Sequence, residues 1–133
     1  MTPISYRTNE CISGKQLAQV FMQSGIRRPV EDLARMEAML KHGNLLITAW
    51  AGDSLVGVAR ALTDFSFCCY LSDLAVDKAY QKQGIGTALI RQVRAAIGEQ
   101  STLLLLAAPE AMDYYPKVGF EAVENGWIIK RAR

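Results

Sequence analysis

One stretch, residues 70–97, constrains the fold more than any other part of the chain. Its first part, Tyr70 to Val76, is apolar and typical of a strand, and its last part repeats apolar residues at the spacing of a helix face, at Ile85, Leu89, Val93 and Ile97. Between them stands QKQGIG, residues 81–86. Glycines let a ligand approach the main chain, and the first amides of a helix lack intrahelical acceptors and lie at the positive end of its dipole. The stretch therefore predicts a strand, a phosphate-binding turn and a helix.

Two well-known phosphate-binding turns do not fit residues 81–89. A dinucleotide-binding turn needs G-x-G-x-x-G, but Leu89 stands where the third glycine belongs, and such a turn normally opens its fold instead of starting beyond residue 70. A P-loop needs Gly-Lys-Ser or Gly-Lys-Thr, which is absent from the sequence.

A third interpretation rests on two motifs. Gln81, Gly84 and Gly86 form Gln-x-x-Gly-x-Gly after a strand ending in LAV, residues 74–76, and this pattern resembles the acetyl-coenzyme A signature of the GNAT N-acetyltransferase superfamily. Residues 111–120, AMDYYPKVGF, resemble the later A-x-x-F-Y-x-K-x-G-F segment of that family. The spacing of the motifs also agrees, so that the resemblance covers about residues 4–130.

The order of elements predicts one α/β domain, residues 1–133, with a central mixed sheet flanked by helices. A capping box at Ser13 begins the first helix, and Pro29 suits the first turn of the second. The order βααβββαβαββ resembles the GNAT fold. The expected strands are 4–7, 45–51, 54–62, 65–76, 102–107 (buried on both faces), 120–123 and 127–130, and the expected helices begin at 13, 29, 84 and 110.

Composition excludes several classes of protein. The net charge of +2 is too small and too evenly spread to predict a nucleic-acid surface. No signal peptide or membrane-spanning run is recognisable, and Cys11, Cys68 and Cys69 form no Cys-x-x-Cys pair, so that we expect buried thiols in a cytoplasmic protein. The single histidine, His42, suits a helix end, and no metal site is expected.

The resemblance implies which residues bind acetyl-coenzyme A. The strand before the turn would pair with the pantetheine arm, and the amides of the turn would hold the pyrophosphate. The positions that match are Leu74, Ala75, Val76, Gln81, Lys82, Gln83, Gly84, Ile85, Gly86 and Thr87.

The resemblance also implies a proton donor. Tyr115 matches the family's tyrosine, whose phenol can protonate the departing thiolate, while Pro116 departs from the pattern and could change the aim of that phenol. Asp73, an acidic residue in an apolar strand, has two possible roles: a base for the acceptor amine, or a hydrogen-bonding group that holds a distortion of the strand.

The predicted function is N-acetyltransferase activity, by direct transfer from acetyl-coenzyme A to a primary amine of a small molecule in a ternary complex. The residues that the family often places along the acceptor are Phe21, Ile26, Arg27 and Arg28. The alternative is a non-catalytic acyl-coenzyme A-binding module or partner subunit. Neither nucleic acid nor a membrane is an expected partner, and the sequence leaves a homodimer open.

Overall fold

The computed structural model describes residues 2–133, and its centre is a five-stranded sheet in the order β1-β2-β3-β4-β5. Strands β1 to β4 pair with one another in antiparallel fashion, and β5 is parallel to β4. The mixed sheet confirms the predicted fold class. The strands are β1 (Ile4–Thr8), β2 (Leu45–Ala51), β3 (Ser54–Thr63), β4 (Cys68–Val76) and β5 (Thr102–Leu104).

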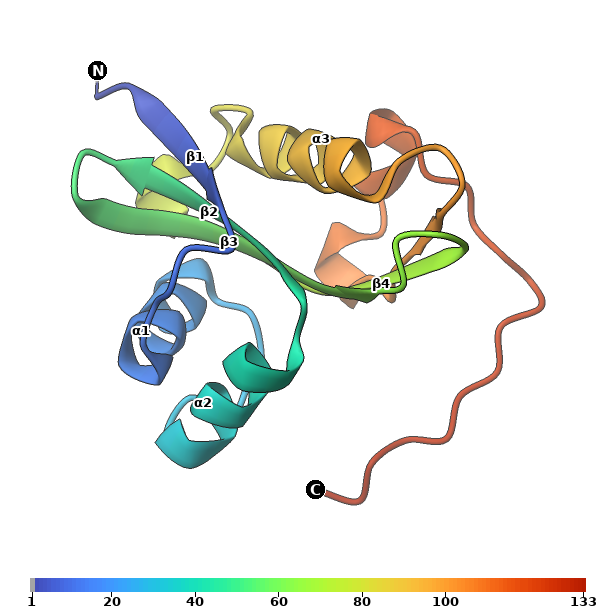
Figure 1. Ribbon diagram of the computed structural model, residues 1–133, viewed down its shortest axis with the longest axis horizontal. Helices are drawn as coiled ribbons and strands as arrows, with labels where there is room; N and C mark the ends of the chain where they lie inside the picture. The colour runs from blue at the N-terminus through green and yellow to red at the C-terminus, as the bar shows by residue number, and fades with distance from the viewer. Residues whose placement is uncertain (1) are drawn as a thin grey trace.

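Helices cover both faces of this sheet (Figure 1). On one face lie α1 (Gly14–Ser24) and α2 (Leu33–His42), which pack with Trp50, Val58 and Ala75, and on the other lies α3 (Ile85–Ile97). The capping box at Ser13 is present as predicted, whereas α2 begins after an Asp32 cap instead of at Pro29. The two apolar clusters are separated by the sheet, which gives the molecule three layers.

Strand β4 is irregular in its middle. Arg60 of β3 faces Asp73, but the next residue, Ala61, faces Leu71, so that Ser72 is the extra residue of a β-bulge. On its other side β4 pairs with β5 only from Cys68 to Tyr70. Within the described chain no strand pairs with that edge beyond Tyr70, and the main-chain groups of the second half of β4 are therefore available to a ligand.

The segment after α3 corrects two predictions. We expected residues 102–107 to form a strand buried on both faces, but β5 has three residues, and Leu104 and Leu106 are 45% and 62% exposed. The expected helix at 110–117 is a pair of short 3-10 helices, η2 (Pro109–Ala111) and η3 (Tyr115–Val118). Turn residues 112–114 separate the two, and Pro116 lies in the first turn of η3.

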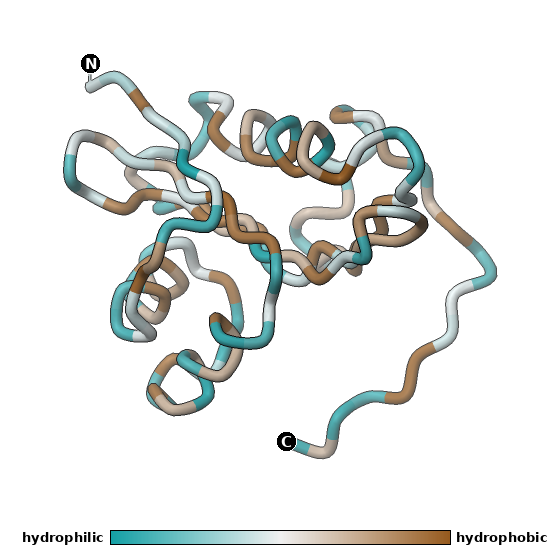
Figure 2. Tube along the Cα trace, in the orientation of Figure 1, coloured by the Kyte–Doolittle hydropathy of each residue, from teal (hydrophilic) through white to brown (hydrophobic). Residues whose placement is uncertain are grey.

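The predicted final hairpin, residues 120–123 and 127–130, is wrong. Residues 120–133 contain no strand; they loop away from the body of the molecule, with Trp127 97% and Ile129 99% exposed, and the chain then returns to Arg35, which donates to Arg133 (Figure 1). Figure 2 shows hydrophobic and hydrophilic stretches alternating along this segment. Such a pattern describes a local preference, while a strand also needs a neighbouring edge for its hydrogen bonds, and this segment pairs with none.

The cysteines agree only in part with expectation. Cys69 is buried, but Cys11 and Cys68 are exposed, and all three thiols are free. Residues 2–133 contain no helix long and apolar enough to cross a membrane. In the same residues no three His, Cys, Asp or Glu side chains gather as metal ligands would.

Candidate active site

A cavity of about 220 Å³ opens where β4 parts from β5. Its walls are the end of α1 with the loop that follows, the second half of β4, the chain beyond β5, and the two 3-10 helices. We call it the central cavity. Its lining residues include Ser24, Ile26, Arg28, Ser72, Leu74, Ala75, Val76, Gln81, Glu110 and Tyr115.

The turn before α3 lies against this cavity through Gln81. The Gln81 side-chain amide donates to the carbonyl oxygen of Val76 at 2.9 Å, which ties the turn to the end of β4. Gly84 is the N-cap of α3 with φ +83°, and no described side chain caps the helix. A Cβ added to Gly84 would meet no described atom within 4 Å, so that the space over this helix start is open. Uncapped amides and open space are what a phosphate group requires.

The predicted coenzyme A residues fall into three groups. Leu74, Ala75, Val76 and Gln81 line the central cavity. Lys82 has a positive φ of +65°, and it forms the turn with Gln83 and Gly84. The remaining three residues, Ile85, Gly86 and Thr87, form the first turn of α3. Ile85 is buried, Gly86 has no side chain, and the Thr87 hydroxyl contacts the Tyr114 hydroxyl at 3.1 Å. These three residues can therefore offer a ligand mainly their main-chain amides. The structure brings the ten positions together, and their role stays a prediction.

Tyr115 lies on the cavity wall in spite of Pro116. Its ring packs edge-on against Tyr114 and Phe120, with ring centres 5.2 Å and 5.4 Å away. Pro116 lies in the first turn of η3, where a missing N–H removes no helical hydrogen bond. Burial, with a smaller contribution from Tyr114, raises the pKa of Tyr115, so that the phenol holds its proton throughout the neutral range.

Asp73 does not line the cavity, and its side chain is fully buried. One carboxylate oxygen accepts from Arg28 Nε at 2.6 Å, and the other accepts from Arg60 Nε. The same two guanidinium groups donate to Ser72, Arg28 to its carbonyl oxygen at 2.9 Å and Arg60 to its hydroxyl at 3.0 Å. The four side chains thus hold the bulge of β4, and the geometry favours the structural role that the sequence left open for Asp73.

Sequence reasoning missed two functional candidates. Glu110 is the only acidic side chain among the described residues that line the central cavity. Its position directly before the second motif segment, residues 111–120, was the available signal. Arg60 carried no signal, because its pairing with Asp73 depends on the register between β3 and β4.

The mixed sheet thus has a free strand edge beside an uncapped helix start, an arrangement that can receive an extended ligand with an anionic group. The Acetyltransferase (GNAT) domain profile matches residues 12–128, and the chain belongs to this family. Uncharacterized N-acetyltransferase ycf52 of Pyropia yezoensis is 32% identical over 122 residues, 85% of this chain and 67% of the relative.

GCN5-related N-acetyltransferase 2, chloroplastic, of Arabidopsis thaliana is 36% identical over 74 residues, 54% of this chain. The match spans only 29% of that relative, and another, ycf52 of Porphyra purpurea, is matched over 56% of its length.

Solved structures agree on the fold. A GNAT family acetyltransferase of Streptococcus pneumoniae superimposes with a TM-score of 0.74 at 23% identity, over 97% of this chain and 100% of that one. An aminoglycoside N-acetyltransferase in complex with CoA gives a TM-score of 0.72 at 17% identity, over 98% and 96% of the chains. At these identities the likeness shows the fold alone.

Proposed function

We propose that the protein is an N-acetyltransferase that moves an acetyl group from acetyl-coenzyme A to a primary amine of a small molecule, by direct transfer in a ternary complex. One observation carries the proposal: the free edge of β4 runs from the bulge at Ser72 to Val76, where Gln81 ties the turn before the uncapped α3 to the strand, and Tyr115 lies on the wall of the same cavity.

The residues present fit coenzyme A. The first amides of α3 and the turn at 81–84 would bind the pyrophosphate, because the helix dipole and the unpaired N–H groups favour an anion there. The main chain of Leu74, Ala75 and Val76 would hold the pantetheine arm as an added strand is held. When bound, the thioester supplies the activated acetyl group.

The proton transfers are assigned to two side chains of the cavity. Tyr115, protonated at neutral pH, would donate to the departing thiolate. The acceptor ammonium must lose a proton before it can attack, and Glu110, the acidic residue among the described lining of the cavity, would accept it, directly or through water. Asp73, bound to both arginines, would act as a positioning residue that keeps β4 bulged beside the thioester.

A thiol-release assay tests the function. The protein is incubated with acetyl-coenzyme A and a panel of amines, and free coenzyme A is detected with a thiol reagent. Amine-dependent release, confirmed as an acetylated product by mass spectrometry, would support the enzyme. Tight coenzyme A binding without release from any amine would support the alternative, a non-catalytic binding module.

A further inference from the structure

A second pocket of about 410 Å³ adjoins the central cavity at the junction of α1 and α2. Ile26 and Arg28 line both, so that the two spaces meet at these side chains. We call the second pocket the arginine groove. It is lined by Met22, Ile26, Arg27, Arg28, Pro29, Val30, Arg35, Arg131 and Arg133.

The groove has an excess of positive charge. Its lining includes arginines and apolar residues and no acidic side chain. Of these arginines only Arg28 pairs with an acidic side chain within residues 2–133, and it shares that partner, Asp73, with Arg60. Two guanidinium groups therefore face one carboxylate, and one positive charge remains uncompensated at the border of the two pockets.

The other arginines add to this charge. Arg27 is exposed, and its carbonyl oxygen accepts from Arg28 Nη1 at 2.7 Å. Arg35 donates to the main-chain oxygen of Arg133 at 3.1 Å, which brings the end of the described chain to the groove. Guanidinium groups held close to one another repel, and a bound anion relieves that repulsion. Their planar donor forks match carboxylate and phosphate oxygens.

We propose that the acceptor amine carries an acid group, a carboxylate or a phosphate, which binds in the arginine groove while the amine lies in the central cavity. The inference rests on the proposed acetyltransferase function. Glu110 lines the central cavity and the arginines line the groove beyond Arg28, so that the two pockets offer opposite charges to the two ends of one molecule. A zwitterionic acceptor of amino-acid type fits this arrangement, and a plain alkylamine leaves the groove unused.

Matched pairs of acceptors test the proposal. Steady-state kinetics compare 4-aminobutyrate with butylamine for the carboxylate, and O-phosphoethanolamine with ethanolamine for the phosphate. We expect kcat/KM to be roughly tenfold to a hundredfold higher for the acidic member of at least one pair, as for hydrogen bonds to charged groups. The pair with the larger ratio identifies the acid. Neutral amines used as well as their acidic counterparts, or better, would overturn the proposal.

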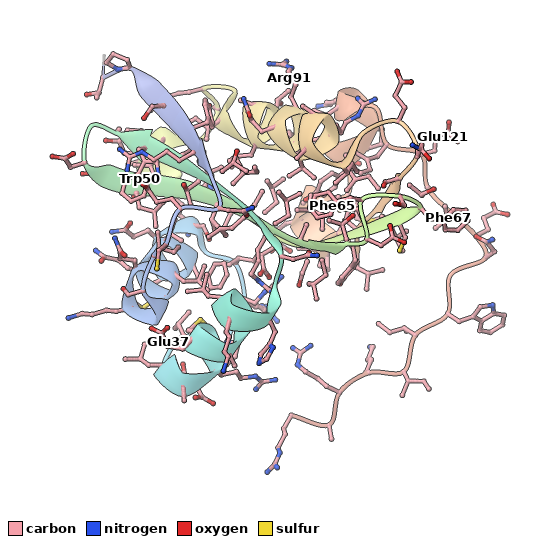
Figure 3. All side chains as sticks on the ribbon, viewed as in Figure 1. Glu37, Trp50, Phe65, Phe67, Arg91 and Glu121 are labelled. Atoms are coloured by element: carbon pink, nitrogen blue, oxygen red, sulfur yellow. The ribbon has the colours of Figure 1, made fainter. Side chains whose placement is uncertain are left out.

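Variants separate the groove from general surface charge. Arg27→Gln and Arg35→Gln should each raise KM for the acidic acceptor and reduce the acidic-to-neutral ratio by about tenfold. Arg91→Gln is the matched control, since Arg91 lies on the outer side of α3, across the sheet from the groove (Figure 3), and its ratio should stay that of the wild type.

The two failures remain distinguishable. An unchanged ratio in both groove variants would overturn the groove assignment while amine-dependent thiol release continued. Absence of release from every amine would instead contradict the acetyltransferase function itself.

Discussion

The two sides of the candidate site are built from different parts of the chain. On the proposed coenzyme A side, the groups available for binding are mainly main-chain: the free edge of β4 and the first amides of α3. On the proposed acceptor side they are side chains, Arg27, Arg28 and Arg35 from the α1–α2 region and Glu110 from η2. A main-chain site tolerates most substitutions except those that change the backbone, whereas a side-chain site can be altered by one residue. The family can therefore keep one co-substrate while its members vary the acceptor.

The largest effect is expected where the two sides join, at Asp73. Asp73→Asn removes the negative charge that two buried or half-buried guanidinium groups share, and breaking such a pair costs about 3–5 kcal/mol of unfolding free energy. Denaturant titration measures the loss. The control is Glu10→Gln, which breaks the half-exposed Arg7–Glu10 pair and should cost no more than about 1 kcal/mol. If the Asp73→Asn protein is as stable as the wild type but has a much lower turnover, the result would favour the other role predicted for Asp73, that of a base for the acceptor amine.

Tyr115→Phe should have the next largest effect, on turnover alone. The ring keeps its packing and loses the proton donor, and general-acid help is typically worth about a hundredfold or more, although a thiolate leaving group needs less. We expect turnover to fall by roughly ten- to a hundredfold, with an unchanged melting temperature. Tyr114→Phe is the control, since its hydroxyl contacts Thr87 and no proton transfer is assigned to it.

The pH profile provides a separate check on Tyr115. Burial raises the pKa of this phenol above its ordinary value, so that the donor stays protonated through the neutral and mildly alkaline range. A fall in activity between pH 7 and 9 that disappears in Tyr115→Phe would contradict the assignment.

Backbone changes at the start of α3 should weaken coenzyme A binding by about tenfold, equivalent to ~1.4 kcal/mol. Gly84→Ala strains a residue with φ +83°, and Gly86→Glu places a negative charge beside the phosphate and a Cβ 3.0 Å from the Tyr114 hydroxyl. Calorimetric titration measures the affinity. Gly98→Ala is the matched control, because it strains a positive φ of +77° at the other end of α3. Equal losses of affinity in all three variants would show a general effect on the helix.

The smallest effect is expected at Lys82. Lys82→Gly removes a cation and also relieves a positive φ of +65°. If main-chain groups dominate phosphate binding, coenzyme A affinity should change by no more than about threefold, less than one hydrogen bond to a charged group. A tenfold loss of coenzyme A affinity with a strong salt dependence would show that the Lys82 side chain contributes substantially to phosphate binding. The two sides of the site would then not differ in the kind of group that binds.

Much of this molecule could be predicted because its signals are local. The capping box at Ser13, the short connection between strands 45–51 and 54–62 and the glycines at the start of α3 act through neighbouring residues, and each appears where the sequence predicts it. The coenzyme A residues came together for the same reason, since they lie within one strand, one turn and one helix start.

The rest depends on contacts between distant residues. Ser72 is bulged because of how β3 and β4 align, and Arg28 reaches Asp73 from a loop 45 positions earlier in the chain. Residues 127–130 have the composition of a strand but no edge to pair with. A local sequence pattern contains no information on the register between two strands or on whether a strand edge is available for pairing.

Because the C-terminal segment is exposed, the intrinsic tryptophan fluorescence of the protein can follow this segment separately from the core. The two tryptophans of the chain lie in opposite surroundings. Trp50 is 6% exposed, with its indole N–H donating to the Thr48 hydroxyl at 2.8 Å, and Trp127, in the C-terminal segment, is 97% exposed. Indole emission shifts to longer wavelength in water, so that the native spectrum is the sum of a blue component from the core and a red one from the C-terminal segment. Acrylamide should quench the red component first. A change in the red component alone therefore reports movement of residues 120–133, and a change in the blue one reports unfolding of the sheet.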